Sequence, residues 1–339
     1  MMEPVQNQVC LSVIISTYNR ADVLRQTLEA MCAVDREGLD VEFVVIDNNS
    51  TDDTPEVIDS FAERLHLRHL FECRPGKSCA VNHALDTVEL GEIVVFTDDD
   101  VVPRRDWLTQ IAAACERWPE YDVFGGKIEL IWPKRAEIPR WATEIVIIRQ
   151  VGFGEHNVGT EDKPYERYTI PCGSNYWVRS RVLSDGVRLN ESLGPPRPGH
   201  RFGMGEETEF LRMAAGGSDL LYVPGSIVGH HVQVSLLDSR NMLKRVILHG
   251  RGKVHLRGLP DPERLIDSPW RWRMRRIAAI TWYLVRFLGG QLHIDECIRM
   301  KNAVEVLRGY GYHREALYLS WGRHRRDGSG IASCEDEVP

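Results

Sequence analysis

The chain has 339 residues, of which 43% are hydrophobic and 27% are charged, and its formal net charge is −7. This composition predicts a globular protein with a full hydrophobic core and excludes fibrous and low-complexity chains. The acidic total argues against general nucleic-acid binding, so we expect no nucleic acid among the partners.

The cysteines and the apolar segments of the sequence indicate in which cellular compartment the protein is expected. Eight scattered cysteines form no CxxC pair, which favours reduced thiols in a cytoplasmic protein over disulfides or a zinc site. Residues 1–10 lack the features of a signal peptide, and residues 277–288, the most apolar late stretch, fall short of the roughly 18 to 20 residues of a membrane span. We therefore expect a cytoplasmic protein that is at most peripheral on the inner face of the cell membrane.

Apolar runs and helical spacing alternate through the first hundred residues. The apolar runs predict strands over 11–16, 41–46, 67–71 and 93–96. The segments between them predict helices over 21–33, 55–64 and 79–88. Such alternation with short links predicts an α/β fold with a mostly parallel sheet and helices on both faces. Ligands bind at the carboxyl ends of the strands in such sheets, so the four loops that follow these strands should share one rim.

The last of these loops holds three adjacent acids, Asp98, Asp99 and Asp100, directly after a buried strand. Adjacent carboxylates repel one another unless a cation or a solvated turn relieves them. A hard divalent cation could bridge two of them to a diphosphate. No GxGxxG follows the first strand and no GxxxxGK[ST] occurs, so the Rossmann dinucleotide and P-loop sites are excluded.

These motifs, in their order and spacing, resemble family 2 glycosyltransferases of the GT-A fold. The matching stretches are residues 12–20 (SVIISTYNR), 45–52 (VIDNNSTD), 96–100 (FTDDD), 172–179 (CGSNYWVR) and 205–212 (GEETEFLR). The resemblance covers roughly the first 235 residues. It implies an inverting hexosyltransferase of the kind used in bacterial polysaccharide and glycan biosynthesis. Such an enzyme moves a sugar from a nucleotide diphosphate to a glycan or lipid-linked glycan.

The resemblance assigns the acidic triplet as a DXD-type metal and donor motif. Asp98 would lie towards the ribose and the metal, and Asp100 would ligate a divalent ion, Mn²⁺ or Mg²⁺. Asp99 belongs to the same donor loop but would point away as a surface acid. His230 would complete the metal shell, which suits Mn²⁺; a packed histidine, or ligation by His231 instead, is the alternative.

The loops after the first two strands would bind the nucleoside. Thr17 and Asp47 resemble the positions that bracket it, with Tyr18 and Asn19 in the same group. Many uridine-using relatives have a second aspartate where this chain has Asn48. An amide both donates and accepts, so uracil, thymine and guanine all remain open as the base.

Two further loops would bind the diphosphate and the acceptor. Gly76 would let the backbone approach the nucleotide, and Lys77 would reach a phosphate, although a solvated lysine is the alternative. Ser174 and Asn175 would line the floor between donor and acceptor, with Asn175 bonded to a sugar hydroxyl.

Glu206 and Glu207 stand where the family usually has Glu-Asp, whose aspartate is the general base. Position for position, Glu207 is the base and Glu206 the second candidate. Because glutamate is one methylene longer, its carboxylate must be set back to keep hydrogen-bond reach. The alternative is an acidic helix N-terminus favoured by the macrodipole.

Two other functions remain open. A catalytically silent sugar-nucleotide-binding module would explain the glutamate at position 207. A nucleotidyltransferase is less favoured, because it would normally carry a Gly-rich basic loop after the first strand. Replacing Glu207 with glutamine separates the transferase from the silent module.

The C-terminal region differs in charge from the rest. Residues 240–326 hold 19 Lys and Arg against 7 Asp and Glu, a surplus of 12, so the remainder carries −19. Helices are expected over 239–253 and 277–288, the second preceded by WRWRMRR. Basic residues and tryptophans beside an apolar stretch suit a helix on an anionic membrane; a helical subdomain packed on the sheet is the alternative.

We therefore expect three parts along the chain. Residues 1–235 would form the GT-A domain, with a nucleotide-binding half over 1–120 and an acceptor and catalytic half over 121–235. Residues 236–326 would form the basic helical region, and 327–339 a loose acidic tail.

Overall fold

The structure is a computed structural model of the chain, and it describes residues 8–166, 169–193 and 205–326. The chain divides into two compact units, Met1–Asn241 and Met242–Pro339, each of which is described by itself. The expected acidic tail at 327–339 lies outside the described residues.

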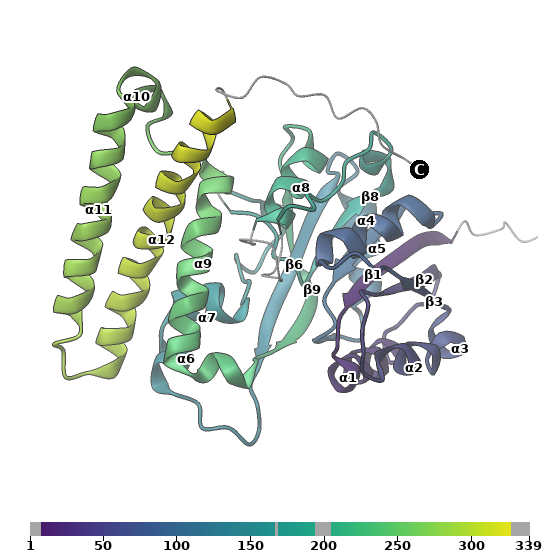
Figure 1. The fold of residues 1–339 in the computed structure, drawn as a ribbon. Coiled ribbons are helices and arrows are strands. Elements are labelled where there is room, and N and C mark those ends of the chain that lie inside the picture. Colours follow the sequence, from purple (N-terminus) through teal and green to yellow (C-terminus); the bar gives the residue numbers. More distant parts are fainter. Residues whose placement is uncertain (1–7, 167–168, 194–204, 327–339) are drawn as a thin grey trace, which may run out of the picture. The chain divides into compact units, whose positions relative to one another are not determined.

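A mixed sheet forms the centre of the first unit. Among the described residues it has nine strands in the order β3-β2-β1-β4-β8-β6-β9-β5, with β7 paired to β9 (Figure 1). The strands are β1 (Val9–Thr17), β2 (Leu39–Asp47), β3 (Leu67–Phe71), β4 (Ile93–Thr97), β5 (Val101–Pro103), β6 (Val123–Ile131), β7 (Lys163–Pro164), β8 (Tyr176–Arg179) and β9 (Leu221–His231). Strands β1 to β4 are mutually parallel, which confirms the predicted α/β sheet, whereas β8 joins β4 and β6 antiparallel.

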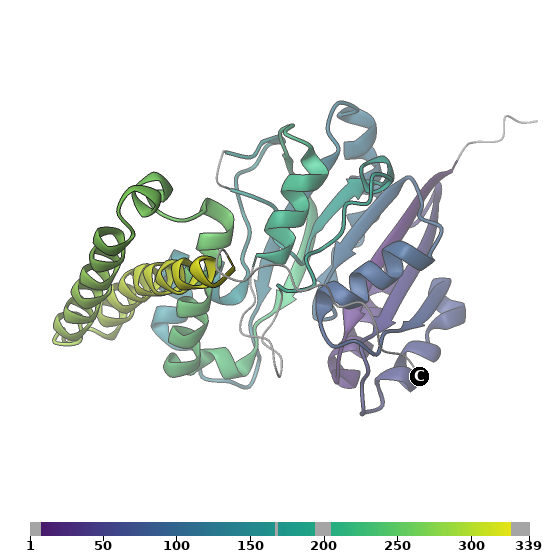
Figure 2. The same cartoon turned by 45° about the horizontal axis from the view of Figure 1, so that its top comes forward.

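Helices lie on both sides of this sheet (Figures 1 and 2). They are α1 (Ala21–Cys32), α2 (Thr54–Asp59), α3 (Ala62–Leu65), α4 (Lys77–Thr87), α5 (Trp107–Arg117), α6 (Arg140–Glu144), α7 (Val146–Phe153) and α8 (Glu206–Ala215), with 3₁₀ turns η1 (Ser180–Leu183) and η2 (Val234–Leu237). The single helix expected over 55–64 is wrong, because it divides into α2 and α3. Ser60 Oγ donates a hydrogen bond to the Val57 carbonyl there, a local bond that competes with the helical ladder.

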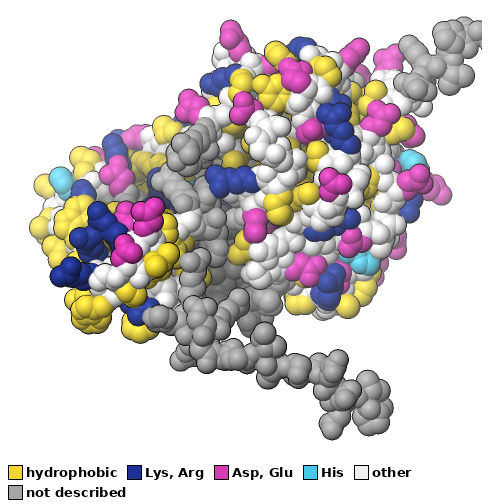
Figure 3. Space-filling view, turned by 90° about the horizontal axis from the view of Figure 1, so that it is seen from above, with side chains coloured by type: hydrophobic (Ala, Val, Ile, Leu, Met, Phe, Trp, Pro, Cys, Tyr) yellow, Lys and Arg dark blue, Asp and Glu magenta, His cyan; other side chains and the backbone are white. Residues whose placement is uncertain are grey.

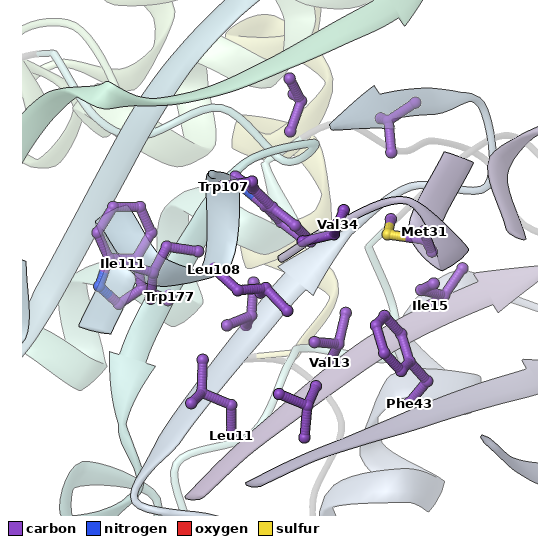
Figure 4. Packing of buried hydrophobic residues seen from close by; sticks show 14 of the residues in the cluster. Leu11, Val13, Ile15, Met31, Val34, Phe43, Trp107, Leu108, Ile111 and Trp177 are labelled. Atoms are coloured by element: carbon purple, nitrogen blue, oxygen red, sulfur yellow. The ribbon is translucent and has the colours of Figure 1, made fainter. Parts of the chain in front are cut away.

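The core has one cluster on each face of the sheet, because successive strand residues point to opposite sides. Val13 and Ile15 pack with α1, α2 and α5 on one face, where Trp107 and Trp177 also lie (Figure 4). Ile14 packs with α4 and α8 on the other face. Each such buried aliphatic side chain contributes about 1.5–3 kcal/mol of hydrophobic free energy. This packing fixes the positions at which the parallel strands end.

The second unit is helical. Its helices are α9 (Ser239–Arg257), which begins in the last residues of the first unit, α10 (Pro262–Asp267), α11 (Pro269–Gly290) and α12 (Glu296–Arg326). Helix α12 contacts α9 closely, because a Cβ built on Gly250 would lie 2.2 Å from the Arg308 carbonyl oxygen. On its other side the ring of His313 stacks on Tyr283 of α11. Within the described residues, none of the helices is both long and apolar enough to cross a membrane.

Candidate active site

The loops after the parallel strands meet on one rim, as predicted. The Asn19 backbone N–H donates to Ser50 Oγ at 2.9 Å, and the Thr51 N–H donates to Asn19 Oδ1 at 2.6 Å. These bonds join the loop after β1 to the loop after β2. Asn19 has a φ of 50°, a left-handed conformation that asparagine tolerates. The exposed ring of Tyr18 lies next to it at the rim.

Asn48 ties the end of β2 to the loop after β3. Its Nδ2 donates to the Glu72 and Arg74 carbonyls at 2.9 and 2.7 Å, and its Oδ1 accepts the Gly76 N–H at 2.6 Å. Gly76 has a φ of 130°, so glycine is required for its backbone conformation. Both N–H donors of the Asn48 amide are thus bonded to the backbone. Asp47 beside it is also buried, and its Oδ1 accepts the Ser50 N–H.

Asp99 is buried, which contradicts the expectation of a surface acid. Its Oδ2 accepts the Thr17 hydroxyl at 2.7 Å, and its Oδ1 lies 2.6 Å from Nη1 of Arg20. Burial raises the pKa of Asp99 to about 6, and the Arg20 charge opposes that rise. Thr17 is buried as well, and its hydroxyl holds Asp99.

Asp98, Asp100 and His230 come together as a candidate metal site. Their ligand atoms all lie within 4.8 Å of one another. Pairing of β5 with β9 sets Val101 opposite His230, which brings the imidazole beside Asp100. Asp100 Oδ1 is buried without a hydrogen-bond partner, and His230 Nε2 lies 3.2 Å from it without hydrogen-bond alignment. An orphaned carboxylate oxygen among two further oxygen and nitrogen ligands fits a divalent cation such as Mn²⁺.

Arg20 forms ion pairs with two carboxylates of this acidic cluster, and His230 lies beside one of them. Arg20 Nη2 lies 2.8 Å from Asp100 Oδ2, in addition to its contact with Asp99. Burial alone would raise the pKa of Asp100, but His230 and Arg20 lower it below its usual range. Arg20 was not among the predicted site residues. The available signal was its place at the end of the TYNR run, since β1 and β4 are neighbours in the sheet.

Lys77 joins the acidic triplet to the candidate base. Its Nζ lies 2.7 Å from Asp98 Oδ1 and 2.8 Å from Glu207 Oε1. Burial alone would lower the pKa of Lys77, but these two carboxylates raise it well above its usual value. Ser174 Oγ donates to the other carboxylate oxygen of Asp98. Lys77 is thus an ion-paired residue of the site, and the alternative of a solvated lysine is wrong.

The two glutamates of α8 differ in surroundings. Glu206 is buried, its Oε2 accepts the Gly205 N–H, and burial followed by the Glu207 charge raises its pKa to about 6. Glu207 instead reaches Lys77 and lies against the backbone of Gly173. A Cβ built on Gly173 would fall 2.1 Å from Glu207 Oε1, so position 173 leaves room for the glutamate only as glycine.

Asn175 is a structural residue, which contradicts its expected role on the acceptor side. It is fully buried, and its Oδ1 accepts the Trp107 indole N–H at 3.0 Å. Its Nδ2 donates to the Lys127 and Ser226 carbonyls. With its amide engaged in the core, no group of Asn175 is offered to a sugar.

Comparisons with known proteins relate the chain to a family of enzymes. Residues 12–171 match the sequence model of the family described as "Glycosyl transferase family 2". Glycosyltransferase AglE of Haloferax volcanii is 24% identical over 292 residues, which cover 82% of this chain and 81% of AglE. The uncharacterised protein y4gI of Sinorhizobium fredii is 33% identical over 128 residues, 37% of this chain and 14% of that protein. Mannosyltransferase PcManGT from Pyrobaculum calidifontis, solved with GDP-Man and Mn²⁺, shares the fold with a TM-score of 0.50 and 19% identity, covering 94% of this chain and 88% of that one.

Proposed function

Because the chain belongs to glycosyltransferase family 2 and has the GT-A fold, we propose a specific reaction for it. The enzyme moves a sugar from a nucleotide diphosphate to a glycan or lipid-linked glycan, with inversion at the anomeric carbon. Glu207 is the general base, and Asp98, Asp100 and His230 hold Mn²⁺ or Mg²⁺. The observation that carries the proposal is the pair of contacts from Lys77 to Asp98 and Glu207. These contacts place the Lys77 ammonium group between the proposed donor site and the proposed base.

The donor side must accept a leaving diphosphate. A bound divalent ion would supply charge neutralisation for the leaving group. Lys77 adds a positive charge that can transfer from Asp98 and Glu207 to a phosphate oxygen, as expected from its motif. Tyr18 is 57% exposed at the rim and offers an aromatic face for the nucleobase. PcManGT, which shares the fold, was solved with a nucleotide sugar and Mn²⁺, and this supports the donor class and the metal.

The acceptor side needs a group that removes a proton. In the proposed step the acceptor oxygen attacks the anomeric carbon while its proton passes to a Glu207 carboxylate oxygen. The bond between the sugar and the diphosphate breaks, and its electron pair leaves on the phosphate oxygen. Lys77 pairs with Glu207 in the resting site, and a phosphate that draws the ammonium away would free this carboxylate to act as the base.

A catalytically silent module is the alternative, since glutamate replaces the usual aspartate at 207. The bare backbone at Gly173 supports the transferase, because it supplies the space that the extra methylene requires. We place the reaction in the cytoplasm, with its acceptor at or near the inner membrane face.

Glu207→Gln tests the proposal against the silent module. The variant should lose about 100- to 10,000-fold in transfer rate, the usual contribution of a general base. Uridine, thymidine and guanosine diphosphates, each tried with and without Mn²⁺, should still raise its melting temperature by mass action. Glu209→Gln, an exposed acid two residues along α8, is the matched control and should keep full activity. Unchanged transfer by Glu207→Gln, or no nucleotide shift in any variant, would contradict the proposal.

A further inference from the structure

Helix α11 uses one face within its own unit, and among the described residues the side chains of its opposite face are exposed. On the inner side Trp272 is buried, the Tyr283 ring stacks on His313, and Arg273 Nη2 donates to the Ser320 carbonyl at 2.9 Å. On the outer side a stripe of large apolar side chains follows helical spacing. This outer face of α11 consists of Trp270, Met274, Ile277, Leu284, Val285 and Leu288, each at least 41% exposed.

The stripe extends beyond both ends of the helix. Ile266 before it is 80% exposed, and Ile294 after it is 98% exposed. The stripe runs from Trp270 to Leu288 on α11, about 27 Å at 1.5 Å per residue. Exposed apolar side chains repeated over this length are typical of an interaction site and not of an ordinary solvated helix.

Positive charge accompanies this face. Helix α11 contains five arginines and no acidic residue. Arg271, Arg275 and Arg286 are exposed and share one flank of the helix, with the Arg286 guanidinium 4.7 Å from the ring centre of Trp282. Seen from above, the helical unit shows hydrophobic side chains with Lys and Arg, and also Asp and Glu, side chains among them (Figure 3). An apolar stripe with a row of arginines along its edge matches the boundary between acyl chains and anionic headgroups.

We propose that the outer face of α11 lies in the interface of an anionic lipid bilayer, parallel to the membrane plane. An antiparallel pairing of two copies through the face would place the arginine rows beside each other, which disfavours that form of self-association. A nucleic acid is disfavoured as well, because the centre of the face is apolar. The residues outside 240–326 also carry a net charge of −19, which would repel the phosphate backbone.

The proposal does not depend on the reaction of the first unit. Together with the proposed function, it identifies the acceptor as one carried on or near a membrane. An in-plane helix would hold the enzyme at the surface where such an acceptor is concentrated, because binding there turns a search through the cell volume into a search over a surface.

Sedimentation of the full chain with vesicles tests the proposal. The protein should pellet with phosphatidylcholine vesicles that contain phosphatidylglycerol, should remain in solution with pure phosphatidylcholine, and should be released by salt. Val285→Glu combined with Leu288→Glu should weaken binding by about tenfold or more. Replacing Arg271, Arg275 and Arg286 with glutamine should cost about fivefold for each charge. Val146→Glu, an exposed apolar position on α7, is the matched control and should bind like the wild type.

Further measurements keep the proposal open to refutation. Circular dichroism must show all variants folded, as expected for changes at exposed positions. Brominated acyl chains should quench tryptophan fluorescence, and Trp270→Phe with Trp282→Phe should remove most of that quenching. Equal vesicle binding by the Val285 and Leu288 variant would overturn the proposal. It would also be overturned if light scattering showed a wild-type dimer that this variant converts to a monomer, because the face would then join two copies.

Discussion

Replacing Gly173 with alanine should displace the Glu207 carboxylate and leave the fold intact. A Cβ at position 173 would lie 2.1 Å from Oε1 and 2.4 Å from Oε2 of Glu207, whereas real Cβ atoms stay beyond 3.0 Å. The carboxylate must therefore move by about 1 Å, which is possible because it ends a flexible side chain. A displacement of about 1 Å at a catalytic group costs on the order of 100-fold in rate, equivalent to about 2.7 kcal/mol.

The assay is steady-state transfer measured beside thermal melting and nucleotide binding. Gly173→Ala should lower kcat about 100-fold while the melting temperature and the nucleotide affinity stay near wild type. Adding Glu207→Asp shortens the base by one methylene, so the double variant should recover part of the lost kcat. Gly289→Ala is the matched control, because no heavy atom lies within 4 Å of a Cβ built there. A wild-type kcat in Gly173→Ala, or a double variant slower than Gly173→Ala alone, would refute the reasoning.

Three further predictions concern the neighbours of this pair. Glu206→Gln should stabilise the protein at pH 8 by about 2 kcal/mol and have no effect at pH 4 in urea unfolding. Because burial raises the pKa of Glu206 to about 6 in the folded protein, the ionised glutamate destabilises the wild type at pH 8. This destabilisation disappears as pH falls from 6 towards the ordinary pKa of 4.5, so glutamine has no advantage at pH 4. Asn48→Ala should cost about 2–4 kcal/mol, because it leaves backbone groups of the β3–α4 loop unpaired, whereas exposed Asn157→Ala should cost little. Calorimetry should find that Mn²⁺ raises nucleotide affinity by about 5- to 150-fold and that nucleotide raises Mn²⁺ affinity by the same factor; independent binding would contradict this.

Local pattern predicted the parallel part of the fold well. Each of the first four strands is an apolar run that ends in polar residues, and such runs specify a buried parallel sheet without knowledge of the partners. The carboxyl ends of parallel strands share a rim, so Asp98, Lys77 and Asn48 could be expected near one another. Strand β8 could not be placed in this way, because its antiparallel insertion between β4 and β6 depends on contacts distant in sequence.

The hydrogen-bond partners and the burial of each side chain were harder to predict than its position near the rim. Asn175 lies beside the site in sequence, yet the Trp107 indole and the β6–β9 backbone consume its amide. Asp99 was expected at the surface because the resemblance gives the metal and ribose roles to its neighbours, but Thr17 at the end of β1 and Arg20 in the loop after it hold Asp99 in a buried position. Both outcomes depend on donors from segments distant in sequence, and no spacing within one motif reports them.

The charges at the rim explain why the metal and the donor should enter together. Asp98, Asp100 and Glu207 each lie beside a positive side chain, which is Arg20 for Asp100 and Lys77 for the other two. A diphosphate arriving alone would meet these carboxylates, and repulsion inside a partly buried site is weakly screened. A divalent ion arriving alone would be attracted to Asp100 Oδ1 but would meet the positive charge of Arg20 on Oδ2 of the same carboxylate. If Asp98, Asp100 and His230 hold the ion and a diphosphate draws Lys77 away as proposed, every charge would keep a partner. Glu207 would then be freed from Lys77 only when the donor is bound, which would restrict an active base to the loaded site.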